Sequence, residues 1–191
     1  MEEKLETISL ADARESTFNF AQKIFIYYML FSVFGFYSEI FWAEFVHLGT
    51  AKPFSDPILQ TIIPMASPYG LGAIAVILIV WPLIKKNKIN PALVLILNII
   101  ITGAVEFVCA AVLVIFSGHN YFWNYSAKLL NLNGFVCLES ALIFGVLATL
   151  FIYLFYPFIE KFMQRFNTRQ INAVFWILIT FYILDLLYSY A

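Results

Sequence analysis

Four carboxylates fall inside long apolar stretches of this 191-residue sequence: Glu39, Glu106, Glu139 and Asp185. An ionised side chain in hydrocarbon costs about 3 kcal/mol or more, so it normally faces a protein interior or a water-filled cavity. No Lys or Arg lies in the same stretches to neutralise these acids. We therefore expect each acid to be protonated, to be hydrogen-bonded by Tyr, Asn or Ser, or to pair with a group from outside. Such carboxylates could bind a cationic solute or act as an acid or base.

Helical spacing aligns two of these acids with other polar or small residues, because positions three or four apart share a helix face. The two faces consist of Asn98, Thr102, Glu106 and Cys109, and of Ser32, Gly35, Glu39 and Ala43. Both faces should point inward, and small residues permit close helix approach. Glu139 is expected to point away from a third face, formed by Gly134, Cys137, Ala141, Gly145 and Ala148. Asp185, six residues from the C-terminus, is expected to reach the membrane interface.

A polar and aromatic segment, "NYFWNYSAKLLNLNGFVCLES" at residues 120–140, separates two of the apolar stretches. Trp123 and Tyr125 share it with Asn131 and Asn133, whose side chains can cap the following helix or hydrogen-bond a ligand. The candidate substrate-binding residues are Glu39, Glu106, Trp123, Tyr125, Asn131, Asn133, Glu139 and Tyr69. We predict no catalytic residue, metal site or cofactor, since neither the two histidines nor the two cysteines show ligand spacing. Cys109 and Cys137 are expected to be buried thiols.

The composition indicates an integral membrane protein whose first partner is the lipid bilayer. Hydrophobic residues make up 62% of the chain and charged residues only 12%, against about 25% charged residues in soluble domains. The net charge of -1 and the scattered cations argue against nucleic acid as a partner. We expect an all-α fold, a polytopic bundle of transmembrane helices.

About five segments are long enough to cross a ~30 Å hydrocarbon core as helices. They run over residues 23–46, 61–83, 92–116, 134–158 and 171–188. Residues 1–20 are predicted to form a short cytosolic or interfacial helix, with a frayed terminus as the alternative, and residues 21–191 a single transmembrane domain. Pro64 and Pro68 indicate that the second helix starts late, near Pro68, or else that it is kinked.

Lys and Arg predict the orientation, because they are retained on the cytoplasmic side. Nine of the eleven basic residues fall in segments that the five spans place on the same side of the membrane. Only Lys52 and Lys128 fall on the opposite side. This pattern predicts a multi-pass cell-membrane protein with a cytoplasmic N-terminus, an external C-terminus and an external segment around Trp123.

Three stretches carry a family resemblance: "FSVFGFYSEIFW", "PMASPYGLGA" and "YFWNYSAKLLNLNGFVCLESALIFG". Together they resemble the CmpB-like family of bacterial ABC-transporter permeases, type IV, over nearly all of the chain after its N-terminal helix. The sequence departs from the family pattern with Asn124 in place of an acid, Leu130 in place of Pro and Phe135 in place of Arg. The loss of that Arg weakens any role that needs an external cation beside Glu139. The resemblance implies a polytopic bacterial inner-membrane protein that couples to a separate ATPase.

These observations favour a non-enzymatic permease, or substrate-binding membrane component, for a small polar or cationic solute, with an outward-facing acidic and aromatic pocket. The sequence has no G-x-x-x-x-G-K phosphate loop, so a partner would have to supply ATP hydrolysis. Five spans are few for a pore, which favours a homo-oligomer or a complex. Two alternatives remain: an enzyme acting on a lipid-linked substrate through Glu39 or Glu106, and a non-transporting accessory or sensor subunit.

Overall fold

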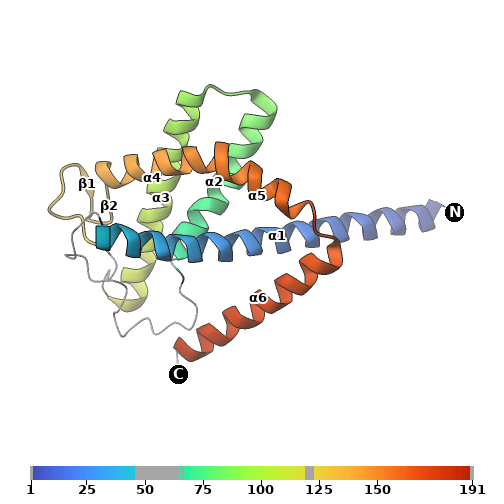
Figure 1. The fold of residues 1–191 in the computed structure, drawn as a ribbon. Helices are drawn as coiled ribbons and strands as arrows, with labels where there is room; N and C mark the ends of the chain where they lie inside the picture. Colours follow the sequence, from blue (N-terminus) through green and yellow to red (C-terminus); the bar gives the residue numbers. More distant parts are fainter. Residues whose placement is uncertain (1, 46–64, 66, 119–122, 190–191) are drawn as a thin grey trace. The chain divides into compact units, whose positions relative to one another are not determined.

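The structure is a computed structural model that describes residues 2–45, 65, 67–118 and 123–189. Its elements are, in order, α1 (Glu2–Phe45), α2 (Ser67–Asn87), α3 (Pro91–Ser117), β1 (Asn131–Leu132), β2 (Val136–Cys137), α4 (Leu138–Leu150), the π-helix η2 (Phe151–Phe155), α5 (Tyr156–Met163) and α6 (Thr168–Ser189) (Figure 1). β1 and β2 pair as a short antiparallel hairpin. The predicted all-α membrane fold is confirmed.

Within the described residues, five helical segments are long and apolar enough to cross a membrane: Asn19–Phe41, Ser67–Lys86, Pro91–Phe116, Leu138–Met163 and Thr168–Tyr188. The chain is therefore a multi-pass membrane protein. Residues 2–20 are helical as expected, but they continue directly into the first span as one helix of 44 residues.

The predicted start is wrong for the fourth helix and confirmed for the second. The fourth helix begins at Leu138 rather than at residue 134, because the hairpin occupies residues 131–137 and Cys137 caps the helix. Gly134 and Cys137 therefore lie outside the predicted small-residue helix face. The second helix begins at Ser67, which places Pro68 in its first turn and confirms the predicted late start.

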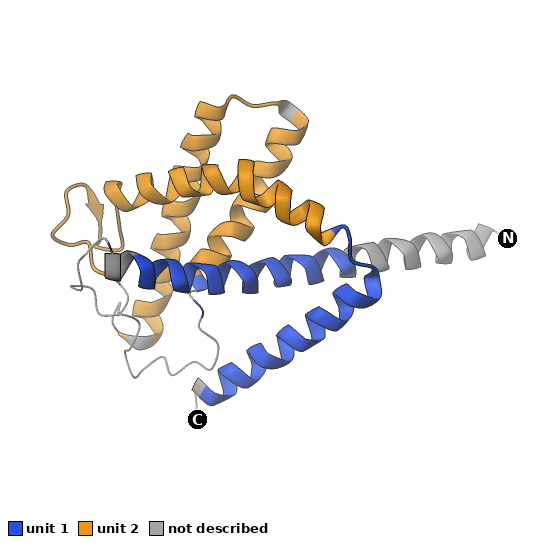
Figure 2. Cartoon of the chain, in the orientation of Figure 1, with its two compact units in different colours: residues 1–67, 164–191 blue, residues 68–163 orange. Residues whose placement is uncertain are grey.

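The contacts divide the chain into two compact units (Figure 2). Unit 1 contains residues 1–67 and 164–191, and unit 2 contains residues 68–163. In unit 1, aromatic rings join α1 to α6: Phe25 meets Phe175 edge-on at 5.5 Å and Tyr182 at 5.8 Å between ring centroids. Asp185 on α6 is only 3% exposed, and its expected place at the membrane interface stays a prediction.

Unit 2 is built on the close packing of α3 against α4. A Cβ on Gly145 would lie 2.9 Å from the Ile99 Cα, so only glycine permits this approach. Across the same interface Asn98 donates a hydrogen bond to Thr149. At the end of α2, Trp81 meets Tyr156 edge-on at 5.0 Å, and the Lys85 ammonium lies 5.0 Å from the Trp81 ring centre.

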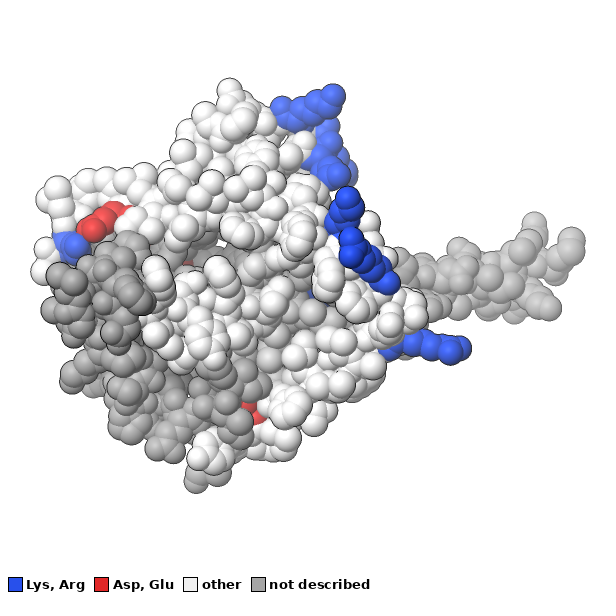
Figure 3. All heavy atoms as spheres, viewed as in Figure 1, with Lys and Arg blue, Asp and Glu red and all other residues white. Residues whose placement is uncertain are grey.

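Apolar side chains dominate the exposed surface of the helices, as expected where lipid is the solvent. Ile115 and Phe116 near the end of α3 are 76% and 85% exposed. Most of the described surface in Figure 3 carries neither a basic nor an acidic group. Charged groups within the spans therefore need a structural or functional explanation.

Candidate functional site

The candidate site is a buried cluster around Glu106, in the α3 span of unit 2. Glu106 is 6% exposed. Its Oε1 accepts a hydrogen bond of 2.9 Å from the Tyr125 hydroxyl, and its Oε2 accepts one of 3.0 Å from the Ser140 hydroxyl. Tyrosine and serine hydroxyls, two of the partners expected for such an acid, therefore hydrogen-bond Glu106.

Tyr125 reaches Glu106 because the loop that carries it folds back on itself. The Tyr125 N–H donates to the Gly134 carbonyl at 2.9 Å, which ties the start of the loop to its hairpin turn. Gly134 has φ +70°, and a Cβ there would lie 2.5 Å from the Ser126 Oγ. Glycine is therefore required both for the backbone conformation and for the close contact.

Ser140 is positioned by the N-terminus of α4. Cys137 is the N-cap: its Sγ accepts from the Ser140 N–H at 3.4 Å, and the Ser140 Oγ accepts from the Cys137 N–H at 3.2 Å. This reciprocal pair is a capping box in which a thiol replaces the usual hydroxyl. The single Ser140 proton also lies near the Cys137 carbonyl, but a carboxylate is the stronger acceptor.

The environment keeps Tyr125 protonated and therefore able to donate. Burial first, and then the neighbouring Glu106 carboxylate, raise the pKa of Tyr125 above its ordinary value of 10.0. The cluster thus presents one buried carboxyl group bonded to two neutral hydroxyls.

The other loop residues hold the hairpin. The Trp123 indole donates to the Phe135 carbonyl at 2.7 Å. Asn131 donates to the Lys128 carbonyl at 2.8 Å and accepts from the Gly134 N–H at 2.9 Å. Asn133 is exposed and has φ +55°, a conformation that asparagine tolerates better than most residues. The expectation that Asn131 or Asn133 caps α4 is wrong, because Cys137 does so.

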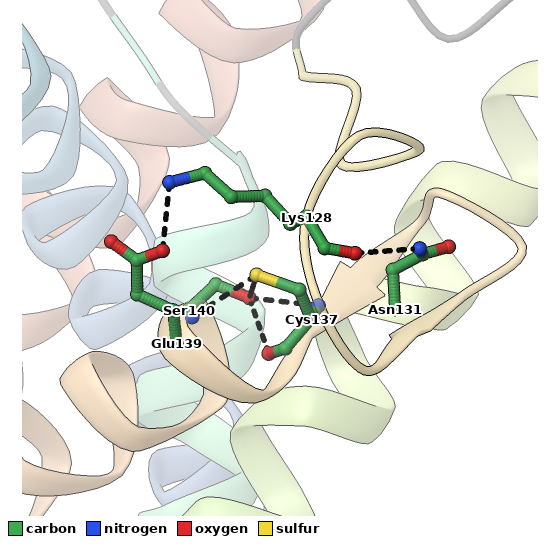
Figure 4. Close-up of polar contacts among 5 residues, drawn as sticks. All are labelled: Lys128, Asn131, Cys137, Glu139 and Ser140. Carbon is green, nitrogen blue, oxygen red and sulfur yellow. Dashed lines mark hydrogen bonds and ion pairs between the residues drawn. The ribbon is translucent and has the colours of Figure 1, made fainter.

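Glu139 lies one residue before Ser140 but has a different partner. Its Oε2 is 2.7 Å from the Lys128 Nζ, and the side chains are 61% and 52% exposed (Figure 4). The hydrogen bond to Glu139, followed by its charge, raises the pKa of Lys128. Lys128 therefore supplies the cation beside Glu139 that Phe135, in place of Arg, does not.

Two further candidate residues lie on other helices, α1 and α2. Glu39 is half-buried on α1, in unit 1, and its predicted sharing of a site with Glu106 stays a prediction. Tyr69 on α2 meets Phe144 on α4 edge-on at 5.6 Å. Thus the structure brings Tyr125 to Glu106 and places Trp123, Asn131 and Asn133 in the supporting hairpin.

Sequence reasoning missed Ser140, Cys137 and Lys128. Ser140 follows Cys137 by three residues, the spacing of a capping box, but cysteine is not a usual cap. Lys128 is the only Lys or Arg between Lys88 and Lys161 in the sequence. This isolation could have indicated that Lys128 pairs with the nearby Glu139.

Comparison with known proteins agrees with this picture. The profile of the family described as "Putative ABC-transporter type IV" matches residues 26–190, which include all of the last four spans and most of the first. No curated protein and no solved structure gives a significant match. Because the match covers most of the sequence, including the Glu106 cluster and its hairpin, the chain belongs to the Putative ABC-transporter type IV family.

Proposed function

We propose that this chain is the membrane-spanning component of a transporter for a small cationic solute, and that Glu106 is its binding carboxylate. The observation that carries this proposal is a buried acid, within a span, whose two oxygens accept from neutral hydroxyls. An acid in this position is costly to the fold and commonly marks a solute or ion site.

A solute cation would compete directly with the Tyr125 and Ser140 hydroxyls for the Glu106 oxygens. A neutral hydroxyl offers only a dipole, whereas an ammonium group adds a charge interaction that is strong where water is excluded. Tyr125 belongs to the loop rather than to a helix, so its displacement would open the cluster without unfolding α3 or α4. The cation distribution of the sequence supports an external position for this loop.

Ligand-dependent thermal unfolding tests the proposal. Purified full-length protein would be heated with choline, spermidine or arginine as probes of three cationic headgroups. We expect at least one to raise the melting temperature, and Glu106→Gln to weaken its binding by tenfold or more, about 1.4 kcal/mol. Glu139→Gln makes the same chemical change at an exposed acid and should bind normally.

A purely structural role for Glu106 is the competing explanation, in which its hydrogen bonds with Tyr125 and Ser140 only tie the loop and α4 to α3. If no probe stabilises the protein, or if Glu106→Gln binds as tightly as wild type, Glu106 is an interhelical hydrogen-bonding residue.

We further propose that a separate ATPase energises transport, as the family description suggests. Affinity purification of the tagged chain from its native membrane should then recover a P-loop ATPase whose hydrolysis rate responds to the transported cation. Recovery without any ATPase would favour an accessory role.

A further inference from the structure

A second polar group lies in the α3–α4 interface, away from the Glu106 cluster. Asn98 precedes Glu106 by eight residues on α3, about 12 Å along the helix axis. It is 0% exposed, and its Nδ2 donates to the Thr149 Oγ1 at 3.0 Å. Both residues lie within membrane-spanning segments.

The hydrogen-bond donors of Thr149 and Asn98 determine how the Asn98 side-chain amide is oriented. The Thr149 hydroxyl donates its proton to the Gly145 carbonyl at 2.8 Å, so it can only accept from Asn98. The Asn98 amide must therefore turn its NH₂ group to Thr149. Its Oδ1 then has no hydrogen-bond donor among the residues that the structure describes. A buried amide oxygen without a donor is destabilising, above all at membrane depth where water cannot replace the missing partner.

A further hydroxyl lies on the helix face of Asn98, and the helix of Thr149 becomes irregular shortly after it. Thr102 shares the helix face of Asn98. Its hydroxyl donates to the main-chain carbonyl of Asn98 at 2.7 Å, so the Thr102 Oγ1 can still accept. Two residues after Thr149 the helix changes to the π-helix Phe151–Phe155. Single π-helical turns interrupt the regular hydrogen-bond ladder and occur frequently at functional sites.

The chemistry of these groups selects the class of ligand. All of them are neutral oxygen acceptors, and no group of three or more His, Cys, Asp or Glu residues with metal-binding geometry occurs in the described part of the chain. Mg²⁺ and Ca²⁺ prefer carboxylates, and transition metals prefer nitrogen or sulfur. Neutral oxygens within a membrane instead coordinate monovalent cations. We infer that Asn98, with Thr102 and Thr149, binds a small monovalent alkali cation in the α3–α4 interface.

Cation-dependent melting of the full-length protein tests this inference. Melting temperatures would be compared in NaCl, KCl and N-methyl-D-glucamine chloride at equal ionic strength, with a thiol-reactive dye that reports exposure of the partly buried Cys109 and the buried Cys137. We expect Na⁺ or K⁺ to raise the melting temperature by about 3–6 °C at ten times its Kd, relative to the bulky organic cation.

Variants separate the site from general salt effects. Asn98→Leu keeps the side-chain size and removes the oxygen, so the cation-dependent shift should vanish. Thr180→Val, which removes an exposed hydroxyl on α6, should retain it. Glu106→Gln should also retain it, so the inference stands or fails independently of the solute site. Should Asn98→Leu fail to fold, Asn98→Asp gives the second test, because its added charge should enlarge the shift.

Equal melting temperatures in all three salts would overturn the inference and leave Asn98 hydrated or bonded within the protein. A cation-dependent shift that survives in Asn98→Leu, or one that Asn98→Asp does not change, would also overturn it.

Discussion

Glu106 and Glu139 are both held by the segment between α3 and α4, yet their surroundings are opposite. Glu106 is buried and accepts from the neutral hydroxyls of Tyr125 and Ser140. Glu139 is exposed and pairs with the Lys128 ammonium. The kind of partner that each acid has matches its exposure to solvent. An exposed ion pair keeps its hydration, whereas burying two charges together carries a large desolvation cost. Under the proposed function, the buried acid that accepts from neutral hydroxyls is the one that receives a cation.

Gly134→Ala should have the largest effect on this arrangement, because it disturbs the hairpin that holds both acids' partners. A left-handed conformation and the contact with the Ser126 Oγ should together cost about 2–4 kcal/mol of unfolding free energy. Gly118→Ala is the matched control, since Gly118 has φ +78° but no atom of the described residues within 4 Å of the position that a Cβ would take. Unfolding in mixed micelles should therefore show a clearly smaller loss of unfolding free energy for Gly118→Ala. Equal losses would mean that the contact with the Ser126 Oγ does not contribute to the cost at Gly134.

Tyr125→Phe should destabilise the protein by about 1.5–3 kcal/mol, because it leaves a buried carboxylate oxygen without its donor. In a Glu106→Leu background the same change should cost little, since no carboxylate remains to be satisfied. A double-mutant cycle followed by unfolding in mixed micelles measures this coupling. Additive effects would mean that the Tyr125 hydroxyl does not stabilise Glu106.

The raised pKa of Tyr125 also predicts that the stability of the protein depends on pH. Because the pKa of Tyr125 is higher in the folded protein than its unfolded value of 10.0, the folded state gains stability below that pH and loses it as the pH rises further. Wild type should thus lose more stability between neutral pH and pH ~11 than Tyr125→Phe does. Parallel melting curves across this range would contradict the expected burial of Tyr125.

Lys128→Met and Glu139→Gln should have the smallest effects, because the pair that they break is exposed. We expect neither to change the unfolding midpoint measurably, and added salt to leave wild type equally stable. A large loss in either variant would show that the exposed and buried acids are energetically alike.

The sequence predicted the fold well because apolar length and membrane exclusion of free backbone groups leave few alternatives. It also predicted that the helix face of Glu106 points inward, and it gave hydrogen bonds from Tyr, Asn or Ser as one of three possibilities for this acid, beside protonation and pairing with an outside group. It did not predict the start of α4, because a hairpin with strands of only two residues and a cysteine cap give no periodic signal. Nor could it assign Tyr125 rather than Trp123 to the acid, since that choice depends on the turn at Gly134 and on how the loop closes.

Binding of a cationic probe to wild type, Glu106→Gln and Glu139→Gln, measured on folded protein by calorimetry, tests the central claim most directly. The three proteins should have the same fold by circular dichroism. We expect Glu106→Gln to bind at least tenfold more weakly than wild type, a loss of about 1.4 kcal/mol, and Glu139→Gln to bind within about twofold of wild type. Equal affinities for wild type and Glu106→Gln, or a loss confined to Glu139→Gln, would contradict it.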